Sequence, residues 1–251
     1  MRFEEERARK ARQNWNSAKV RAEASRWHDF SRTVDYQYMF DWSGLPIIQD
    51  PQDVLMVHEV LWHYNPTVIL ETGIARGGSL MLSAEILAAL SFVDSSVSRS
   101  PRKVIGVDID IRPENKTAVE NHRLGQLIHM IEGSSIEPHV IAKVGELIEP
   151  GARVAVLLDS NHTHDHVLAE LVAYSPLVIQ GGPIIVMDTG IEFAPVDSFA
   201  TRRPWGPGNS PHSAVRAFLA SQAGDGFTID TTYQERHLIS AARDGLLRRK
   251  W

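Results

Sequence analysis

Between residues 68 and 188 the chain repeats one pattern five times: a short apolar run that ends in an acidic residue. The runs span residues 68–71, 104–108, 127–132, 154–159 and 184–188, and they end in Glu71, Asp108, Glu132, Asp159 and Asp188. Runs of this length, rich in Val and Ile, are typical of strands buried on both faces, and the amphipathic stretches between them predict helical crossovers. The pattern therefore predicts a doubly wound α/β fold with a mostly parallel sheet.

The acidic residues at the ends of these runs are expected to gather at one edge of the sheet. In doubly wound folds, ligands bind in the crevice outside the carboxyl ends of the strands. Because all five runs deliver a carboxylate to that edge, we expect a functional site there.

The segment from Glu4 to Trp27 is rich in good helix formers and predicts a helical arm. Trp15 and Trp27 need a surface to cover them, so we expect the arm to contact a second copy in a homo-oligomer, with a solvated helix on its own domain as the alternative. Residues 1–34 form this arm in the predicted division, and residues 35–251 form one domain.

Two further helices and two strands are predicted outside the repeated pattern. Asp50 and Pro51 predict the start of a helix that runs to about Tyr64. Near the C-terminus, a helix over His212–Ser221 and strands over Phe227–Asp230 and Arg236–Ser240 are expected. The preceding loop, Arg202–Pro211, is rich in Pro and Gly and contains Trp205, which favours a lid over the crevice rather than a plain surface turn.

Composition excludes several classes of function. The chain has 26 Lys and Arg against 31 Asp and Glu, so its formal charge of −5 offers no general basic surface for nucleic acid or an anionic membrane. It has no Cys, which excludes disulfides, thiolate metal sites and cysteine nucleophiles. The charged first thirty residues lack the apolar core of a signal peptide, and no run reaches the ~18 apolar residues of a membrane span, so we expect a cytoplasmic protein.

A glycine-rich loop, Glu71–Ser79, follows the first apolar run and opens a helix. Glycines let backbone approach a ligand closely, and a helix N-terminus favours anionic groups. The spacing of the glycines differs from the dinucleotide fingerprint, which disfavours an NAD enzyme. The alternative to a ligand-binding loop is a strand-to-helix turn with a structural role alone. We expect a nucleoside cofactor, with Glu71, Gly73 and Ser79 as candidate binding residues and Asp108 on the ribose hydroxyls.

The densest polar cluster of the chain, residues 159–166, follows the fourth run. Asp159 and Asp188 end successive runs, so they should project from one edge, where two carboxylates suit Mg²⁺. His162 can take a proton from a substrate hydroxyl held there. For His166 a structural role is expected, and His164 and Asp165 are expected in solvent.

Four segments together resemble the cephalosporin hydroxylase family, which is similar to metal-dependent S-adenosylmethionine sugar O-methyltransferases of natural-product pathways. They are Glu71–Ser79, Val107-Asp108, Leu158–His162 with His166–Leu168 after it, and Trp205–Pro211. The resemblance covers about residues 35–250. It implies a Rossmann-like class I methyltransferase, usually oligomeric, that uses S-adenosylmethionine and a divalent metal, typically Mg²⁺, to methylate a hydroxyl of a small natural product, with a sugar as the best candidate acceptor.

The resemblance also implies roles for individual residues. Glu71 and Gly73 would line the methionine portion of the cofactor, Asp108 would bind the ribose, and Ser134 would lie near the adenine. The Asp-x-x-His spacing of Asp159 and His162 is similar to that of metal-dependent sugar methyltransferases.

One departure from the family pattern concerns the metal. Related proteins tend to have an acidic residue immediately before the position of Asp188, where this chain has Met187, and Glu192 is the candidate replacement. Two other functions stay open at this point. His162, His166 and Asp159 have the composition of a non-heme iron hydroxylase triad, and a cofactor-binding accessory subunit would use the fold without chemistry of its own.

Overall fold

The computed structural model describes residues 2–94, 102–194 and 203–251. Within these ranges a seven-stranded sheet has the order β5-β4-β3-β6-β7-β9-β8. Its strands are β3 (Val68–Thr72), β4 (Lys103–Asp108), β5 (Ile128–Glu132), β6 (Val154–Leu158), β7 (Pro183–Val186), β8 (Phe227–Ile229) and β9 (Leu246–Arg249). The strands from β5 to β7 pair in parallel, and β9 is antiparallel to both neighbours. The predicted doubly wound, mostly parallel fold is therefore confirmed.

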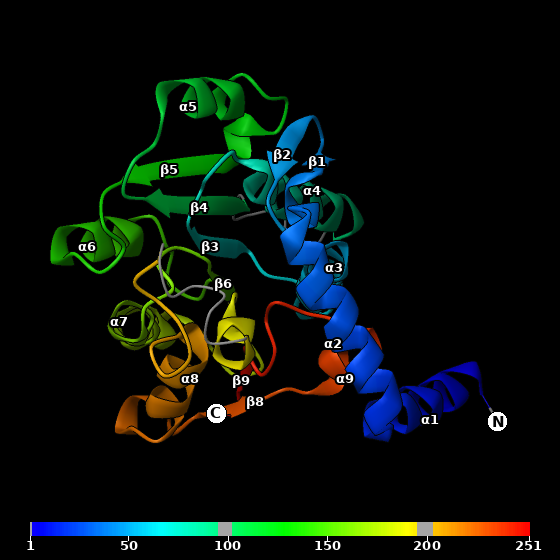
Figure 1. Cartoon of the computed structure of the whole chain (residues 1–251). Helices are drawn as coiled ribbons and strands as arrows, with labels where there is room; N and C mark the ends of the chain where they lie inside the picture. The colour runs from blue at the N-terminus through cyan, green and yellow to red at the C-terminus, as the bar shows by residue number, and fades with distance from the viewer. Residues whose placement is uncertain (1, 95–101, 195–202) are drawn as a thin grey trace.

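Helices cover both faces of this sheet (Figure 1). They are α3 (Pro51–Tyr64), α4 (Gly78–Val93), α5 (Pro113–Glu120), α6 (Pro138–Glu146), α7 (His164–Tyr174), α8 (Pro211–Leu219) and α9 (Thr232–His237). Two buried cores result, one with side chains of α3 and α4 and one with side chains of α6, α7 and α8. Alternate residues of β6, such as Val156 and Leu157, enter opposite cores, as expected for a strand buried on both faces.

The predicted arm consists of two helices, α1 (Phe3–Asn16) and α2 (Ala18–Thr33), and the N-terminus projects away from the domain (Figure 1). Ser17 interrupts the expected single helix because its side chain caps α2 by accepting from the Val20 amide. On α2, Arg32 donates to buried Asp50 at 2.9 Å, and the His28 ring lies 3.2 Å from the same oxygen. These contacts fasten α2 to the domain.

The predicted helix after Asp50 is confirmed as α3, but the predicted strand Arg236–Ser240 is wrong. The Asp230 side chain accepts from the Thr232 amide, and this turn leads into α9. The last strand is instead β9, where Leu246 and Leu247 are buried against β7. Of the loop predicted over Arg202–Pro211, position 202 lies outside the described residues.

A hairpin of β1 (Phe40–Trp42) and β2 (Leu45–Ile47) precedes α3 and packs on α4. It brings the segment 46–49 over the carboxyl ends of β3 and β6. The chain order reverses between these two strands, since β4 and β5 lie beyond β3 while β7 lies beyond β6. A crevice forms at such a switch point. In the described ranges, no helix combines the length and the hydropathy that a membrane crossing requires.

Candidate active site

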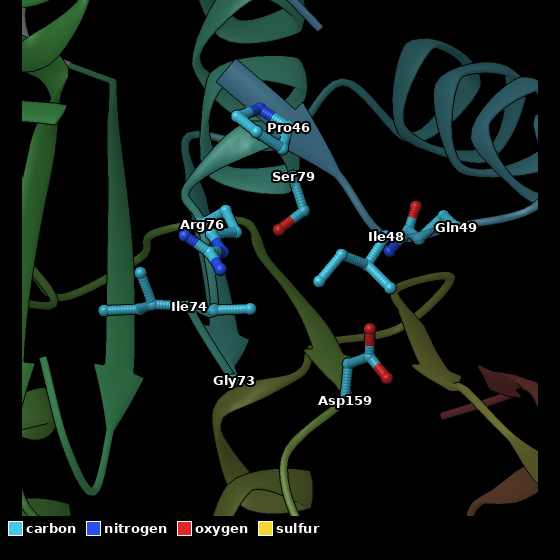
Figure 2. A pocket seen from close by; sticks show the side chains of 10 residues that line it. Pro46, Ile48, Gln49, Gly73, Ile74, Arg76, Ser79 and Asp159 are labelled. Carbon is cyan, nitrogen blue, oxygen red and sulfur yellow. The ribbon is translucent and has the colours of Figure 1, made fainter. Parts of the chain in front are cut away.

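A small pocket, partly open to solvent, lies at the switch point between β3 and β6. It is lined by the segment after the β1-β2 hairpin, by the glycine loop and by Asp159 at the end of β6. Figure 2 shows the side chains of Ile48, Ser79 and Asp159 directed toward one space. The glycine loop and the acidic strand end that the sequence singled out therefore share one pocket.

Glycine is required in the loop because neighbouring backbone passes very close. A Cβ at Gly73 would lie 2.1 Å from the carbonyl oxygen of Asp159, and φ at this glycine is +90°. A Cβ at Gly78 would lie 2.4 Å from the carbonyl oxygen of Pro46. A side chain at either position would push apart the backbones that line the pocket.

Asp108, at the end of β4, fixes the glycine loop from the other side. One carboxylate oxygen accepts from the amides of Ile74 at 2.8 Å and Ala75 at 3.2 Å, and the other accepts from the amide of Asp110 at 3.2 Å. A carboxylate has about four acceptor positions, so a ribose hydroxyl at Asp108 would share its oxygens with these amides. Ser134 is half-buried and starts the turn after β5 at the same sheet edge.

Glu71 is buried near the end of β3, where its carboxyl lies against Ser79 and Ser83 of α4. Burial raises the pKa of its carboxyl to about 7, against hydrogen bonds from Ser79 and Ser83 that lower it. Its Oε1 atom has no hydrogen-bond partner among the described residues. A ligand with a hydrogen-bond donor or a positive charge would supply the missing partner of this oxygen. A turn with a structural role alone would not need such a carboxylate.

Asp159, which lines the pocket, forms a cluster with His162 and Asp188. Each offers one ligand atom, and these atoms all lie within 4.8 Å of one another. His162 Nε2 is 3.6 Å from a carboxylate oxygen of Asp188, which has a left-handed backbone (φ +54°) just after β7. Such a conformation is uncommon for a residue other than glycine and is often found at functional sites.

The electrostatics of this cluster favour a cation. The pKa of Asp159 is well above its ordinary value, first because of burial and then because of the negative charges of Asp188 and Glu71, with a hydrogen bond from Gln49 acting in the opposite direction. A divalent ion would offset the repulsion between the two aspartates. Carboxylate oxygens are the ligands that Mg²⁺ prefers, so the residues fit this ion.

The loop that contains Trp205 covers His162. The rings of Trp205 and His162 meet edge to face, with centroids 4.7 Å apart. Glu192 Oε2 accepts from the Gly208 amide at 3.0 Å and from the Ser210 hydroxyl, which holds this loop in place. Glu192 is thus outside the cluster of metal-ligating side chains, and its expected role as the replacement ligand is wrong.

The other two histidines of this segment face different surroundings. His166 Nε2 lies 3.0 Å from Ser135 Oγ, so the triad of His162, His166 and Asp159 is not assembled among the described residues. This contact agrees with a structural role for His166. The ring of His164 lies 2.8 Å from Ser213 Oγ, so its expected placement in solvent is wrong.

Gln49 and Ile48 are pocket residues that the sequence interpretation missed. Gln49 is buried, its Oε1 has no hydrogen-bond partner in the described part of the chain, and its amide contacts Asp159. Both residues precede α3, outside the pattern of acidic strand ends, so only the hairpin's placement over the sheet brings them to the site.

Comparison with known proteins gives consistent matches. The family model described as Rhamnosyl O-methyltransferase/CmcI matches residues 34–250. A rhamnosyl O-methyltransferase of Mycobacterium leprae (strain TN) is 26% identical over 212 residues, covering 83% of this chain and 82% of that protein. One from Mycobacterium tuberculosis (strain ATCC 25618 / H37Rv) is 28% identical over 177 residues, covering 70% of this chain and 64% of that protein.

Solved structures share the fold. A structure of cmcI with Mg and SAM has a TM-score of 0.55 at 19% identity, and the match covers 85% of this chain and 78% of the cmcI chain. An O-methyltransferase from Bacillus cereus in complex with SAH has a TM-score of 0.52 at 11% identity, covering 84% of this chain and 82% of that one. The predicted Rossmann-like class is therefore confirmed.

Proposed function

This chain belongs to the Rhamnosyl O-methyltransferase/CmcI family and is a methyltransferase, and we propose that it transfers the methyl group of S-adenosylmethionine to a hydroxyl of a small, sugar-bearing natural product. The relatives named rhamnosyl O-methyltransferase support a sugar acceptor. The observation that carries the proposal is the juxtaposition of the glycine-loop pocket with Asp159, His162 and Asp188.

In this proposal the glycine-loop pocket holds the cofactor. Glu71 and Gly73 line its methionine portion, Ser79 lies at the start of α4, Asp108 binds the ribose and Ser134 lies near the adenine. The unpartnered oxygen of buried Glu71 supports the assignment, because the cofactor brings an ammonium group and a sulfonium.

Asp159 and Asp188 hold the divalent ion. Mg²⁺ takes oxygen ligands and keeps several waters, so two carboxylates are sufficient protein ligands. This choice leaves the imidazole of His162 free of the ion and available as a base. A neutral Met187, buried at 3% exposure, lies at the preceding position and does not contribute an oxygen.

The chemistry requires removal of a proton from an alcohol, which is too weak an acid to ionise unaided near neutral pH. When bound, Mg²⁺ would polarise and orient the acceptor hydroxyl, and S-adenosylmethionine would supply the methyl group. His162 accepts the hydroxyl proton as the oxygen attacks the methyl carbon, the C–O bond forms and the C–S bond breaks. Asp188, 3.6 Å from Nε2, then stabilises the imidazolium, and the edge contact with Trp205 orients the ring.

A screen of acceptors tests the proposal. Methyl transfer from S-adenosylmethionine is measured with rhamnosides, other glycosides and a hydroxylated β-lactam, in Mg²⁺ and in excess chelator. We expect transfer to a glycoside hydroxyl that the chelator abolishes and added Mg²⁺ restores. Asp159→Asn should lose activity under both conditions. Glu192 is an acidic residue directed at the loop that contains Trp205, so Glu192→Gln should keep its response to Mg²⁺. Full activity in excess chelator would eliminate the metal.

A further inference from the structure

Helix α7 carries a buried carboxylate that the proposed reaction does not use. Glu170 is fully buried, and its Oε1 accepts from Ser135 Oγ at 2.5 Å and from Ser160 Oγ at 2.7 Å. One turn earlier on the helix, His166 Nε2 lies 3.0 Å from the first hydroxyl and 3.3 Å from the second. We call these four residues the Glu170 cluster.

The cluster joins two loops that come from separate strands. Ser135 follows Ser134 in the loop after β5, whereas Ser160 follows Asp159 in the loop after β6. Two strands, β4 and β3, lie between β5 and β6 in the sheet, so the two loops are not hydrogen-bonded as sheet neighbours. Their serines nevertheless meet on one oxygen atom of α7.

A buried carboxylate is an expensive way to pack a helix against a sheet. Removing such a group from water costs several kcal/mol unless its hydrogen bonds are made. Glu170 makes two bonds through Oε1, and Oε2 has no partner among the described residues. An apolar side chain would fill the position at lower cost, so the two serine contacts are the specific feature that this residue supplies.

We propose that Glu170 and His166 are positioning residues that couple the cofactor loop to the metal loop, so that a nucleoside cofactor and a divalent ion each bind more tightly when the other is present. This inference rests on the proposed function of the same site. Both serines donate to the same oxygen atom of Glu170, so a ligand that fixes the position of one loop also fixes this acceptor and, through it, the other loop. Coupling between two sites is reciprocal and typically amounts to about 5-fold to 150-fold in affinity.

Calorimetry on the full chain measures the coupling. The dissociation constant of S-adenosylhomocysteine is determined in saturating Mg²⁺ and in excess chelator, and that of Mg²⁺ with and without S-adenosylhomocysteine. For the wild type we expect each dissociation constant to be at least about 5-fold lower when the other ligand is present, and we expect the two ratios, without and with the other ligand, to be equal. In Ser135→Ala and Ser160→Ala, each of which loses one hydroxyl, both ratios should fall toward one while each ligand still binds alone.

A matched control separates coupling from general loss of stability. Ser221 donates its hydroxyl to the Phe218 carbonyl at 2.7 Å and is distant in the chain from both loops, so Ser221→Ala loses one serine hydrogen bond and should keep the wild-type ratios. Wild-type ratios in both cluster variants would overturn the inference, as would a wild type that binds both ligands independently. A wild type that does not bind S-adenosylhomocysteine would overturn the proposed function itself, and the inference with it.

Discussion

His162 lies within reach of two carboxylates and a tryptophan, and its role as the base is the most specific claim about a single residue. Replacing it with Ala removes the proton acceptor but leaves the glycine loop intact. We expect kcat to fall by about 10²–10⁴-fold, the usual contribution of a positioned base, with unchanged affinity for S-adenosylhomocysteine.

The matched control for this variant is His164→Ala, since His164 is in the same segment but faces Ser213. It should keep most turnover. Steady-state rates and calorimetry on both variants check the prediction. Wild-type turnover in His162→Ala would move the base elsewhere, with Asp159 or His166 as the next candidates.

Asp53 gives a prediction about stability and pH. It is fully buried under the C-terminal segment and accepts from Ser240 Oγ and from the Ala241 amide, and burial raises the pKa of its carboxyl from 3.8 to about 6. Between these two values the folded chain holds the proton more tightly than the unfolded chain. The free energy of unfolding should therefore fall by about 3 kcal/mol as pH rises through this window.

Asp53→Asn removes this ionisation while the amide can still bond Ser240 and Ala241. Denaturant unfolding at pH 4 and pH 7 should show that the wild type loses stability between these values, and that the loss is smaller by about 2 kcal/mol in the variant, because the unfolded carboxyl is already partly ionised at pH 4. Asp41→Asn, on the exposed face of the hairpin, should retain the wild-type dependence. An identical pH dependence in the wild type and Asp53→Asn would contradict the raised pKa.

Among the elements, the turn between β3 and α4 has the tightest geometric requirement. Gly73→Ala places a methyl group against the Asp159 carbonyl oxygen, at a φ of +90°. We expect loss of S-adenosylhomocysteine binding together with a lower melting temperature, because the β3 and β6 ends must separate.

Gly44 provides the control for backbone strain alone. Its φ is +88°, but a Cβ there meets nothing within 4 Å. Gly44→Ala should therefore cost only about 1–2 kcal/mol and leave cofactor binding unchanged. If Gly73→Ala behaved like Gly44→Ala in calorimetry and thermal unfolding, the close approach at the pocket would be refuted.

How far the sequence predicts an element depends on whether its pattern is local. The five apolar runs became β3 to β7, and β3, β4, β6 and β7 are largely buried because apolar residues without polar alternation have one stable location in an α/β fold, between two layers of helices, whereas β5 lies at the sheet edge and has one buried residue. The segment Arg236–Ser240 has a run too short to distinguish strand from helix. In this region the turn at Asp230 starts helix α9. The last strand is β9, whose sequence ends in two arginines and therefore lacks the continuous apolar pattern of the other strands.

The same distinction applies to the site. Asp159 and Asp188 were predictable as neighbours because strand ends of a parallel sheet meet at one edge. The contributions of Gln49 and Glu170 were not, because they depend on how a hairpin and a helix pack across that edge. Glu192 was misassigned because spacing along the chain does not show which way a side chain points, here toward Ser210.

For the molecule as a whole, the exposed aromatic side chains of the N-terminal arm predict self-association. On α2, Trp27 is 43% exposed and Phe30 is 55% exposed, although large aromatic side chains on a polar helix are poor surface residues. We propose that residues 1–34 assemble a homo-oligomer. Deleting residues 1–30 should lower the mass measured by light scattering to that of one chain.

This deletion keeps Arg32, so one of the contacts that fasten the chain to Asp50 survives. Phe92→Ser is the matched control, since Phe92 is 91% exposed on α4, outside residues 1–34, and its loss should leave the mass unchanged. An unchanged mass after the deletion would make the arm a solvated helix pair on its own domain.

We propose that the glycine-loop pocket binds the nucleoside of S-adenosylmethionine through Asp108, and calorimetric titration tests this without knowledge of the acceptor. We expect saturable binding of S-adenosylhomocysteine to the wild type, no binding of NAD, and a loss of about 1.5–3 kcal/mol in binding free energy in Asp108→Ala, the range for a hydrogen bond to a charged group. Wild-type affinity in Asp108→Ala, or no binding of S-adenosylhomocysteine to the wild type, would contradict it.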